Sequence, residues 1–207
     1  MLYRFKTLLL NKKHIYISLA LIMFLLMPLI VFIGKLGGFL WYEDIQVFSV
    51  LYQFIFVLLS GTAFVFFFQD IVEEKGREIF FVAKRMYLKE AVLFLLLDES
   101  ILFVSLIIAG EASEIYKEGF LFVSVENLLV LGIMYCVLFF SSSATLAIGT
   151  LILLMIQAGM YISDICIMVY WSENYRDMLS KTVYLLGLAI CAWALGGLAN
   201  LFYVKYD

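Results

Sequence analysis

Apolar residues fill six long runs of this chain, and shorter, more polar segments separate them. A helix rises 1.5 Å per residue, so about 20 residues are needed to cross about 30 Å of hydrocarbon. Runs of this length predict six transmembrane helices, which make residues 1–207 a single all-α integral membrane domain. The predicted spans are Ile15 to Ile33, Val47 to Phe68, Ala91 to Ala109, Phe120 to Phe140, Ala144 to Ile162 and Val183 to Val204.

Polar residues interrupt the third and fourth runs. Asp98 and Glu99 lie in the middle of the third run, and Glu126 and Asn127 lie inside the fourth. If Glu126 and Asn127 were outside the membrane, only Leu128 to Phe140 would remain, which is too short to cross it. The pattern therefore favours six spans over five.

The composition is typical of a chain that is surrounded by lipid. Hydrophobic residues make up 65% of the sequence and charged residues 15%, against roughly 25% charged in soluble domains. This excludes an ordinary soluble protein, and the net charge of −3 gives no indication of nucleic-acid binding. Because no clear cleavage motif follows the first run, we expect it to be a retained helix rather than a signal peptide.

Basic residues gather in segments that would share one side of the membrane. Lys and Arg near helix ends favour the cytoplasmic side. The cytoplasmic segments would hold Arg4, Lys6, Lys12, Lys13, Lys75, Arg77, Lys84, Arg85, Lys89 and Lys205, ten of the 14 basic residues. The pattern predicts that both termini and the 69–90 segment are cytoplasmic, with the 163–182 segment outside.

Three segments outside the spans have a character of their own. Residues 1–14 alternate apolar and basic positions at helical spacing, which predicts an interfacial helix or, alternatively, a basic flank that only sets topology. The 69–90 segment is amphipathic and longer than a connector needs, which favours a docking surface over a solvated loop. The 163–182 segment begins with an apolar stretch and is predicted to be re-entrant or interfacial.

The acids inside the third span are the strongest functional indication within the membrane. Ionisable residues there usually face the bundle interior or water. Because consecutive residues diverge by about 100° around a helix, one of Asp98 and Glu99 can line a path while the other bonds a neighbouring helix. A wider candidate translocation path consists of Asp98, Glu99, Gln53, Glu126, Asn127 and Gln157. The alternative is that these side chains only hold helices together, at about 0.6 kcal/mol each.

Enzyme chemistry finds little support in the sequence. His14 is the single histidine, and Cys136, Cys166 and Cys191 are isolated, so neither a Ser–His pair nor a zinc site is indicated. No phosphate-binding G-x-x-x-x-G-K-[ST] loop is present. We therefore expect no catalytic activity, cofactor or metal in this chain, and we interpret the cysteines as packing residues.

The first cytoplasmic segment carries the most specific motif. It reads Glu73-Glu74-Lys75-Gly76-Arg77-Glu78-Ile79, and Lys89 precedes the third span. Together with six spans, cytoplasmic ends, an amphipathic N-terminal segment and a partly apolar outer segment, this motif resembles the permease subunits of ABC type-2 exporters. The topological resemblance covers the whole chain, and the motif covers about twenty residues of it.

The resemblance implies a partner set and a mechanism. The chain would pair with a second copy of itself or a homologous permease, and with separate ATP-binding-cassette ATPase subunits that hold ATP and Mg. The resemblance makes the N-terminal segment a connecting helix and places the protein in the bacterial cytoplasmic membrane, exporting a peptide, bacteriocin or drug. The residues that it assigns to the coupling helix are Glu73, Glu74, Gly76, Arg77, Glu78, Ile79 and Phe80.

Two other functions remain open from the sequence. One is a non-transporting membrane protein that binds a partner or gives immunity to a membrane-active peptide. The other is a secondary carrier that uses Asp98 or Glu99 as a proton site.

Overall fold

The chain forms a bundle of helices. The computed structural model describes residues 10, 13–36, 48–72, 87–111, 116, 119–159 and 175–206, and every regular element within these ranges is helical. This confirms the predicted all-α class. The elements are α2 (Lys13–Leu21), η1 (Ile22–Leu26), α3 (Met27–Leu36), η2 (Ser49–Phe56), α5 (Val57–Val72), α7 (Leu88–Gly110), α9 (Phe120–Ser141), α10 (Ala144–Gly159) and α11 (Tyr175–Tyr206).

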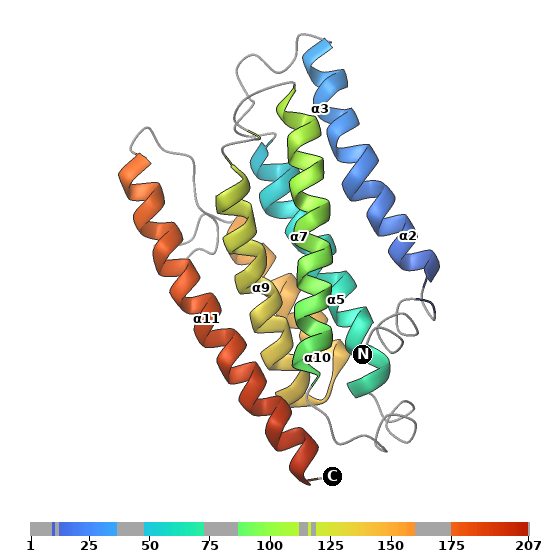
Figure 1. Ribbon diagram of the computed structural model, residues 1–207, viewed down its shortest axis with the longest axis vertical. Coiled ribbons are helices and arrows are strands. Elements are labelled where there is room, and N and C mark those ends of the chain that lie inside the picture. The colour runs from blue at the N-terminus through green and yellow to red at the C-terminus, as the bar shows by residue number, and fades with distance from the viewer. Residues whose placement is uncertain are drawn as a thin grey trace.

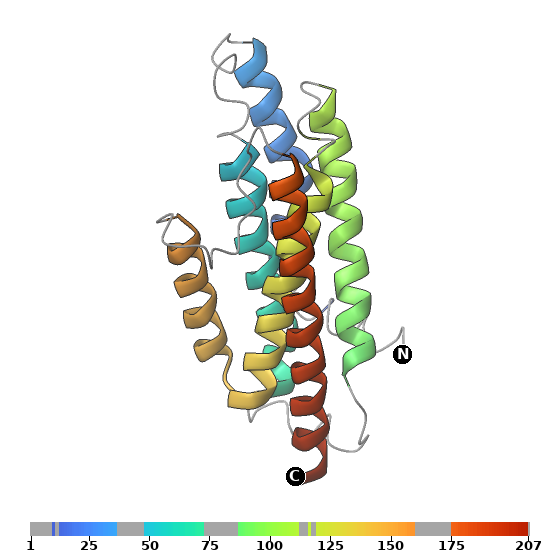
Figure 2. The same ribbon diagram turned by 90° about the vertical axis from the view of Figure 1, so that its left-hand side faces the viewer.

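The helices run alternately up and down the bundle (Figures 1 and 2). Five of the described helices are long and apolar enough to cross a membrane: Tyr16–Leu36, Val50–Val72, Leu88–Gly110, Phe120–Ser141 and Met178–Leu201. Large apolar side chains are exposed on their outer faces, including Leu25, Ile33 and Val183, as expected where lipid replaces water. The chain is a multi-pass membrane protein.

The remaining apolar helix, α10, is shorter than the others. Its 16 residues rise about 24 Å, less than the hydrocarbon thickness of about 30 Å. It packs against α5 and α9 and lies at one side of the bundle (Figure 2). That α10 crosses the membrane, as the sequence predicts for the fifth span, stays a prediction.

Helix bounds differ from the sequence predictions at the ends. Both α7 and α9 continue unbroken through their polar residues, so the acids lie within the helices as predicted. The last helix, α11, begins at Tyr175 rather than Val183. The prediction counted only the apolar residues, whereas the more polar residues before them continue the same helix outside the hydrocarbon. The predicted coupling residues and almost all of the predicted N-terminal interfacial helix lie outside the described ranges. So do residues 160–162 at the end of the predicted fifth span and residues 163–174 of the outer segment.

The first transmembrane helix contains a π-helical turn, η1, directly before Pro28. At the end of this turn, the backbone N–H of Met27 donates to the carbonyl of Ile22, a spacing of five residues. Continuing that spacing would pair the carbonyl of Met23 with residue 28, but proline has no N–H. The hydroxyl of Ser105 on α7 donates to the Met23 carbonyl at 2.8 Å instead. A side chain from α7 therefore supplies the hydrogen bond that the helix lacks.

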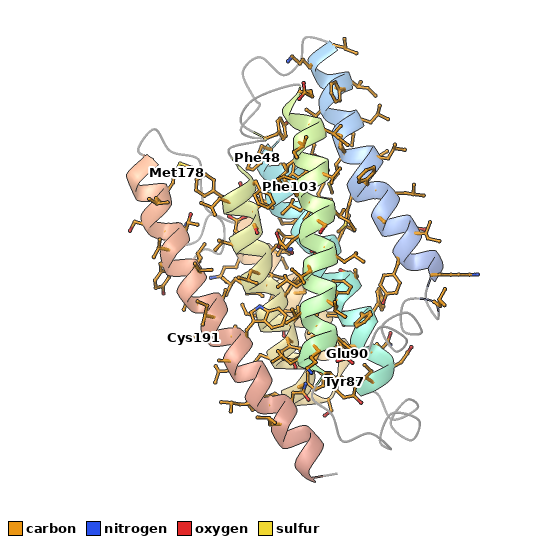
Figure 3. All side chains as sticks on the ribbon, viewed as in Figure 1. Phe48, Tyr87, Glu90, Phe103, Met178 and Cys191 are labelled. Atoms are coloured by element: carbon orange, nitrogen blue, oxygen red, sulfur yellow. The ribbon has the colours of Figure 1, made fainter. Side chains whose placement is uncertain are left out.

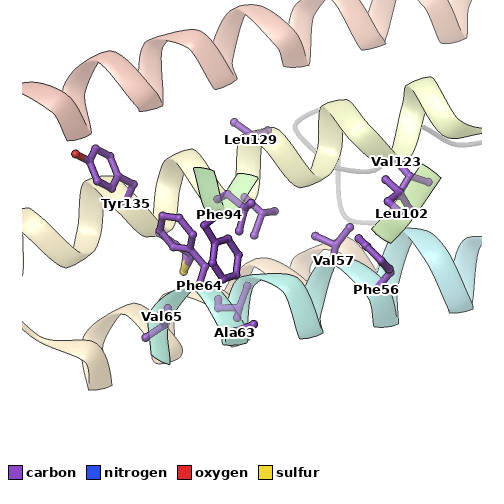
Figure 4. Packing of buried hydrophobic residues seen from close by; sticks show 14 of the residues in the cluster. Phe56, Val57, Ala63, Phe64, Val65, Phe94, Leu102, Val123, Leu129 and Tyr135 are labelled. Atoms are coloured by element: carbon purple, nitrogen blue, oxygen red, sulfur yellow. The ribbon is translucent and has the colours of Figure 1, made fainter. Parts of the chain in front are cut away.

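Aromatic rings fill the core where α5, α7, α9 and α11 meet. Phe64 on α5 makes edge contacts with Phe94, Tyr135 and Trp193 at ring-centroid distances of 5.3, 6.3 and 6.2 Å. Figure 4 shows Phe64, Phe94 and Tyr135 between the helices. Aromatic pairs in this geometry add to the stability of the fold beyond what the burial of their apolar area contributes.

Glycines allow α11 to approach α9 closely. A Cβ atom at Gly196 would lie 3.0 Å from the backbone nitrogen of Cys136, and one at Gly132 would lie 2.7 Å from the indole ring of Trp193. The Trp193 indole N–H donates to the carbonyl of Leu128 at 2.9 Å. Small residues at a helix interface are the usual means of close packing in lipid.

Candidate intramembrane polar site

The polar site lies inside the bundle, where α5, α7 and α9 meet. Asn127 on α9 directs its amide nitrogen toward both acids of α7, at 2.7 Å from Asp98 Oδ2 and 3.0 Å from Glu99 Oε1. An amide nitrogen carries two hydrogens, so it can serve both acceptors. One asparagine thus connects two consecutive carboxylates.

Two serines complete these hydrogen bonds. Ser60 on α5 donates to Asp98 Oδ2 at 2.5 Å, and Ser124 on α9 donates to Glu99 Oε2 at 2.6 Å. Both oxygens of Glu99 therefore accept a hydrogen bond, whereas both hydrogen bonds to Asp98 fall on Oδ2. No Lys or Arg among the described residues forms an ion pair with either carboxylate.

A second pair of predicted path residues lies between η2 and α9. The amide of Gln53 donates to Glu126 Oε1 at 2.9 Å, and both side chains are buried. Gln53 sits in the π-helical segment η2, and such segments often occur at functional sites. The structure thus brings five of the six candidate path residues into hydrogen-bonded groups.

Gln157, the sixth candidate, is apart from these groups. It lies half-buried on α10, and no hydrogen bond joins it to the described residues of the site. Its role in a path stays a prediction.

A cavity of about 280 Å³ lies beside Asp98, between the first transmembrane helix, α5 and α7. Toward its lower end α2 leans away from α7, whereas α3 lies close to α7 above (Figure 1). Asp98 and Lys13 are the charged residues of the lining, and Glu99 does not line it. The other lining residues are Leu10, Tyr16, Ile17, Ala20, Met23, Ala63, Phe94, Leu97 and Ile101.

The two acids therefore occupy different environments. Asp98 lines the cavity with an oxygen, Oδ1, that accepts no hydrogen bond from the described residues, and Glu99 is held by α9. This is the division that helical geometry allows, and the structure identifies Asp98 as the residue at the cavity. That the cavity belongs to a translocation path stays a prediction.

Sequence analysis missed the hydroxyl groups of the site. Ser124 lies three residues before Asn127 and so shares its helix face, a spacing that could have indicated it. Ser60 lies in an apolar run next to Gly61 and Thr62, and nothing in these neighbours indicates that it meets Asp98. Serines within membrane helices commonly bond their own helix, as Ser141 does to the Val137 carbonyl at 2.7 Å.

Polar groups near the lower end of the bundle form a smaller set. Tyr87 and Glu90 lie at the lower end of α7 (Figure 3), and Glu90 is buried. Asn200 on α11 donates to the Tyr135 hydroxyl at 2.5 Å. The Asn200–Tyr135 hydrogen bond joins α9 to α11.

The described residues contain no group of three or more His, Cys, Asp or Glu side chains that could hold a metal ion. What the site offers is a buried acid beside an apolar cavity, within a hydrogen-bonded group that spans three helices. No family model, no curated protein and no solved structure matches this chain.

Proposed function

We propose that this chain is the permease subunit of an ATP-binding-cassette exporter, related to the type-2 family. It would have six transmembrane spans, with α10 as the fifth, and both termini in the cytoplasm of a bacterial cell. It would form the translocation path with a second permease, and separate ATPase subunits would supply the energy.

The observation that carries the transport function is Asp98. Its carboxylate lies inside a membrane-spanning helix and lines a cavity with one oxygen that accepts no hydrogen bond from the described residues. An ionised group at the bilayer centre costs about 2.5–3.5 kcal/mol on insertion scales, so acids there usually mark a path for substrate or ions. An acid kept only to hold helices together would have no need of the cavity.

Support for the ATPase partner comes from the resemblance of Glu73 to Ile79 to the coupling segment of type-2 permeases. In this proposal, residues 73–80 form a short cytoplasmic helix that moves with the ATPase. The absence of a phosphate-binding loop from the chain agrees with ATP hydrolysis on another subunit.

Two substitutions in the proposed coupling segment test this function. Glu74→Ala and Gly76→Leu should abolish the permease-dependent ATP hydrolysis of the purified complex while leaving membrane insertion intact. The matched control is Glu114→Ala, which removes an acid from the predicted outer loop and should change nothing. Unchanged hydrolysis in both coupling variants would refute the assignment.

One observation favours a second function, a non-transporting membrane protein that binds a partner or confers immunity. Both oxygens of Glu99 are hydrogen-bonded, and Asn127 also reaches Asp98. Hydrogen bonds of this kind are also found where polar side chains have the structural role of joining membrane helices. If Asp98→Asn left transport unchanged but weakened the fold, this second function would be preferred.

A further inference from the structure

The cavity beside Asp98 has walls of a distinct chemistry. Its lining is apolar apart from the charged residues Asp98 and Lys13 and the amphipathic Tyr16. Ligand pockets commonly combine such walls with a few polar groups that fix the ligand's orientation. At about 280 Å³ the cavity is near the small end of the usual range, about 300–1,000 Å³. A compact amphiphile fits it better than a lipid with two acyl chains.

The carboxylate at this cavity has acceptor capacity to spare. Ser60 and Asn127 both bond Oδ2, and Oδ1 accepts nothing from the described residues. A carboxylate in apolar surroundings is most stable beside a positive charge. No basic side chain among the described residues forms an ion pair with Asp98. The position beside Oδ1 is therefore open to a positively charged group of a ligand.

Aromatic rings line the same space. Phe94 on α7 lies one helical turn below Asp98 on the same face, and Tyr16 faces the cavity from α2. Faces of aromatic rings attract organic cations, more strongly where water is excluded. An acid flanked by two aromatic side chains is a suitable site for an ammonium group.

Lys13 does not remove this preference. Its side chain is exposed, whereas Asp98 is buried. Exposed charges are screened by water and salt, and buried ones much less so. The buried acid therefore sets the sign of the ligand, and Lys13 acts at the outer edge of the cavity.

We propose that the cavity between α2, α5 and α7 binds a small organic cation, an amine or guanidine on a compact apolar body, with its charged group at Asp98 Oδ1. The inference rests on the proposed function only in making this cation a transport substrate. Binding itself is a property of the single chain and can be measured without an ATPase.

The test is equilibrium binding of 4-phenylbutylamine to the purified full chain in nanodiscs, with 4-phenylbutan-1-ol as the neutral analogue. The amine should bind saturably and at least about tenfold more tightly than the alcohol, because only the amine places a charge beside the acid. Equal affinity of the two probes would overturn the proposal.

Two variants with the same loss of charge locate the site. In Asp98→Asn, the remaining amide oxygen can accept from both Ser60 and Asn127, so the helix contacts stay while an NH₂ group replaces Oδ1. This variant should bind the amine at least about tenfold more weakly. Glu90→Gln removes the charge of another buried acid on α7, about 12 Å along the helix from Asp98 and outside the cavity lining, and should leave the affinity within about twofold. An equal loss in both variants would overturn the assignment to the cavity.

A third variant keeps the test decisive if Asp98→Asn fails to fold. Ala20 lines the cavity from α2 and takes no part in the hydrogen bonds of the polar site. Ala20→Phe should fill the cavity and abolish saturable binding of the amine. Retained binding in Ala20→Phe would refute the proposal.

Failure of this inference and failure of the proposed function give different results. If an ATPase co-purifies but the amine does not bind at Asp98, the exporter stands without this substrate class. If the amine binds as expected but no ATPase is found, the binding site stands and the exporter does not.

Discussion

At the scale of single residues, the consecutive acids Asp98 and Glu99 show what a sequence can and cannot reveal. Their positions inside an apolar run mark them, and the turn of about 100° between neighbours requires that they face different surroundings. Which acid faces the cavity depends on how α7 is rotated against α5 and α9. The sequence does not contain that rotation, and the structure shows it through Ser60, Ser124 and Asn127.

Asn127 provides the sharpest test of the polar site at this scale. Asn127→Leu removes the donor that both carboxylates share and should lower the free energy of unfolding by about 1–3 kcal/mol. Gln157→Leu is the matched control, since it deletes a membrane amide that takes no part in the site, and should have little effect. Unfolding of both variants in mixed detergent micelles measures this, and equal stability would contradict the geometry.

At the scale of the elements, the spans themselves follow from the lengths of the apolar runs, but their irregularities do not. The sequence predicts α7 and α9 to within a few residues, because hydrocarbon thickness sets their length. The π-helical segments η1 and η2 were not predicted, since π-helical hydrogen bonding leaves no periodic pattern over so few residues. Pro28 is a local indication of irregularity, but its hydrogen-bond donor, Ser105, comes from another helix.

The π turn makes Ser105 important to the first helix. Ser105→Ala leaves the Met23 carbonyl without its 2.8 Å donor and should destabilise the protein by about 1–2 kcal/mol. Pro28→Ala restores a backbone N–H at the position that a π turn would use, so the serine substitution should cost less in that background. A double-mutant cycle measures the coupling between these residues. Additive effects would contradict the account of this turn.

Adjacent glycines on α11 test the packing of that helix. Gly196→Ala would bring a Cβ to 3.0 Å from the backbone nitrogen of Cys136, so we expect a loss of about 1–3 kcal/mol. A Cβ at Gly197 would meet nothing within 4 Å. Gly197→Ala should therefore be neutral or stabilising, by up to about 1 kcal/mol. Thermal unfolding distinguishes the two, and the reverse order would disprove the packing of α11 on α9.

At the scale of the whole molecule, the sequence correctly predicts an all-helical membrane bundle. A chain that is 65% hydrophobic cannot form the polar surface that a water-soluble protein needs, and long apolar runs in lipid form helices. The number of crossings is harder to obtain, since the 16 residues of α10 are fewer than a membrane usually needs. The helix directions bear on this number: α9 and α11 both run down the bundle, and α10, which lies between them in the sequence, runs up (Figure 2).

Six crossings place both chain ends on one side of the membrane, whereas five place them on opposite sides. Fusion of green fluorescent protein and, separately, alkaline phosphatase to each terminus in bacteria distinguishes these topologies. We expect fluorescence and no phosphatase activity at both ends, because basic residues gather in the segments that the sequence predicts to be cytoplasmic. Phosphatase activity at one end alone would indicate an odd number of spans.

The most direct test of the exporter proposal is purification of the tagged chain from its native membrane in mild detergent, with mass spectrometry of what accompanies it. We predict an ATP-binding-cassette ATPase in stoichiometric amount, and its loss when residues 73–80 are altered. Recovery of the chain without any ATPase, under conditions that keep other membrane complexes together, would contradict the proposal and favour a partner-binding or immunity protein.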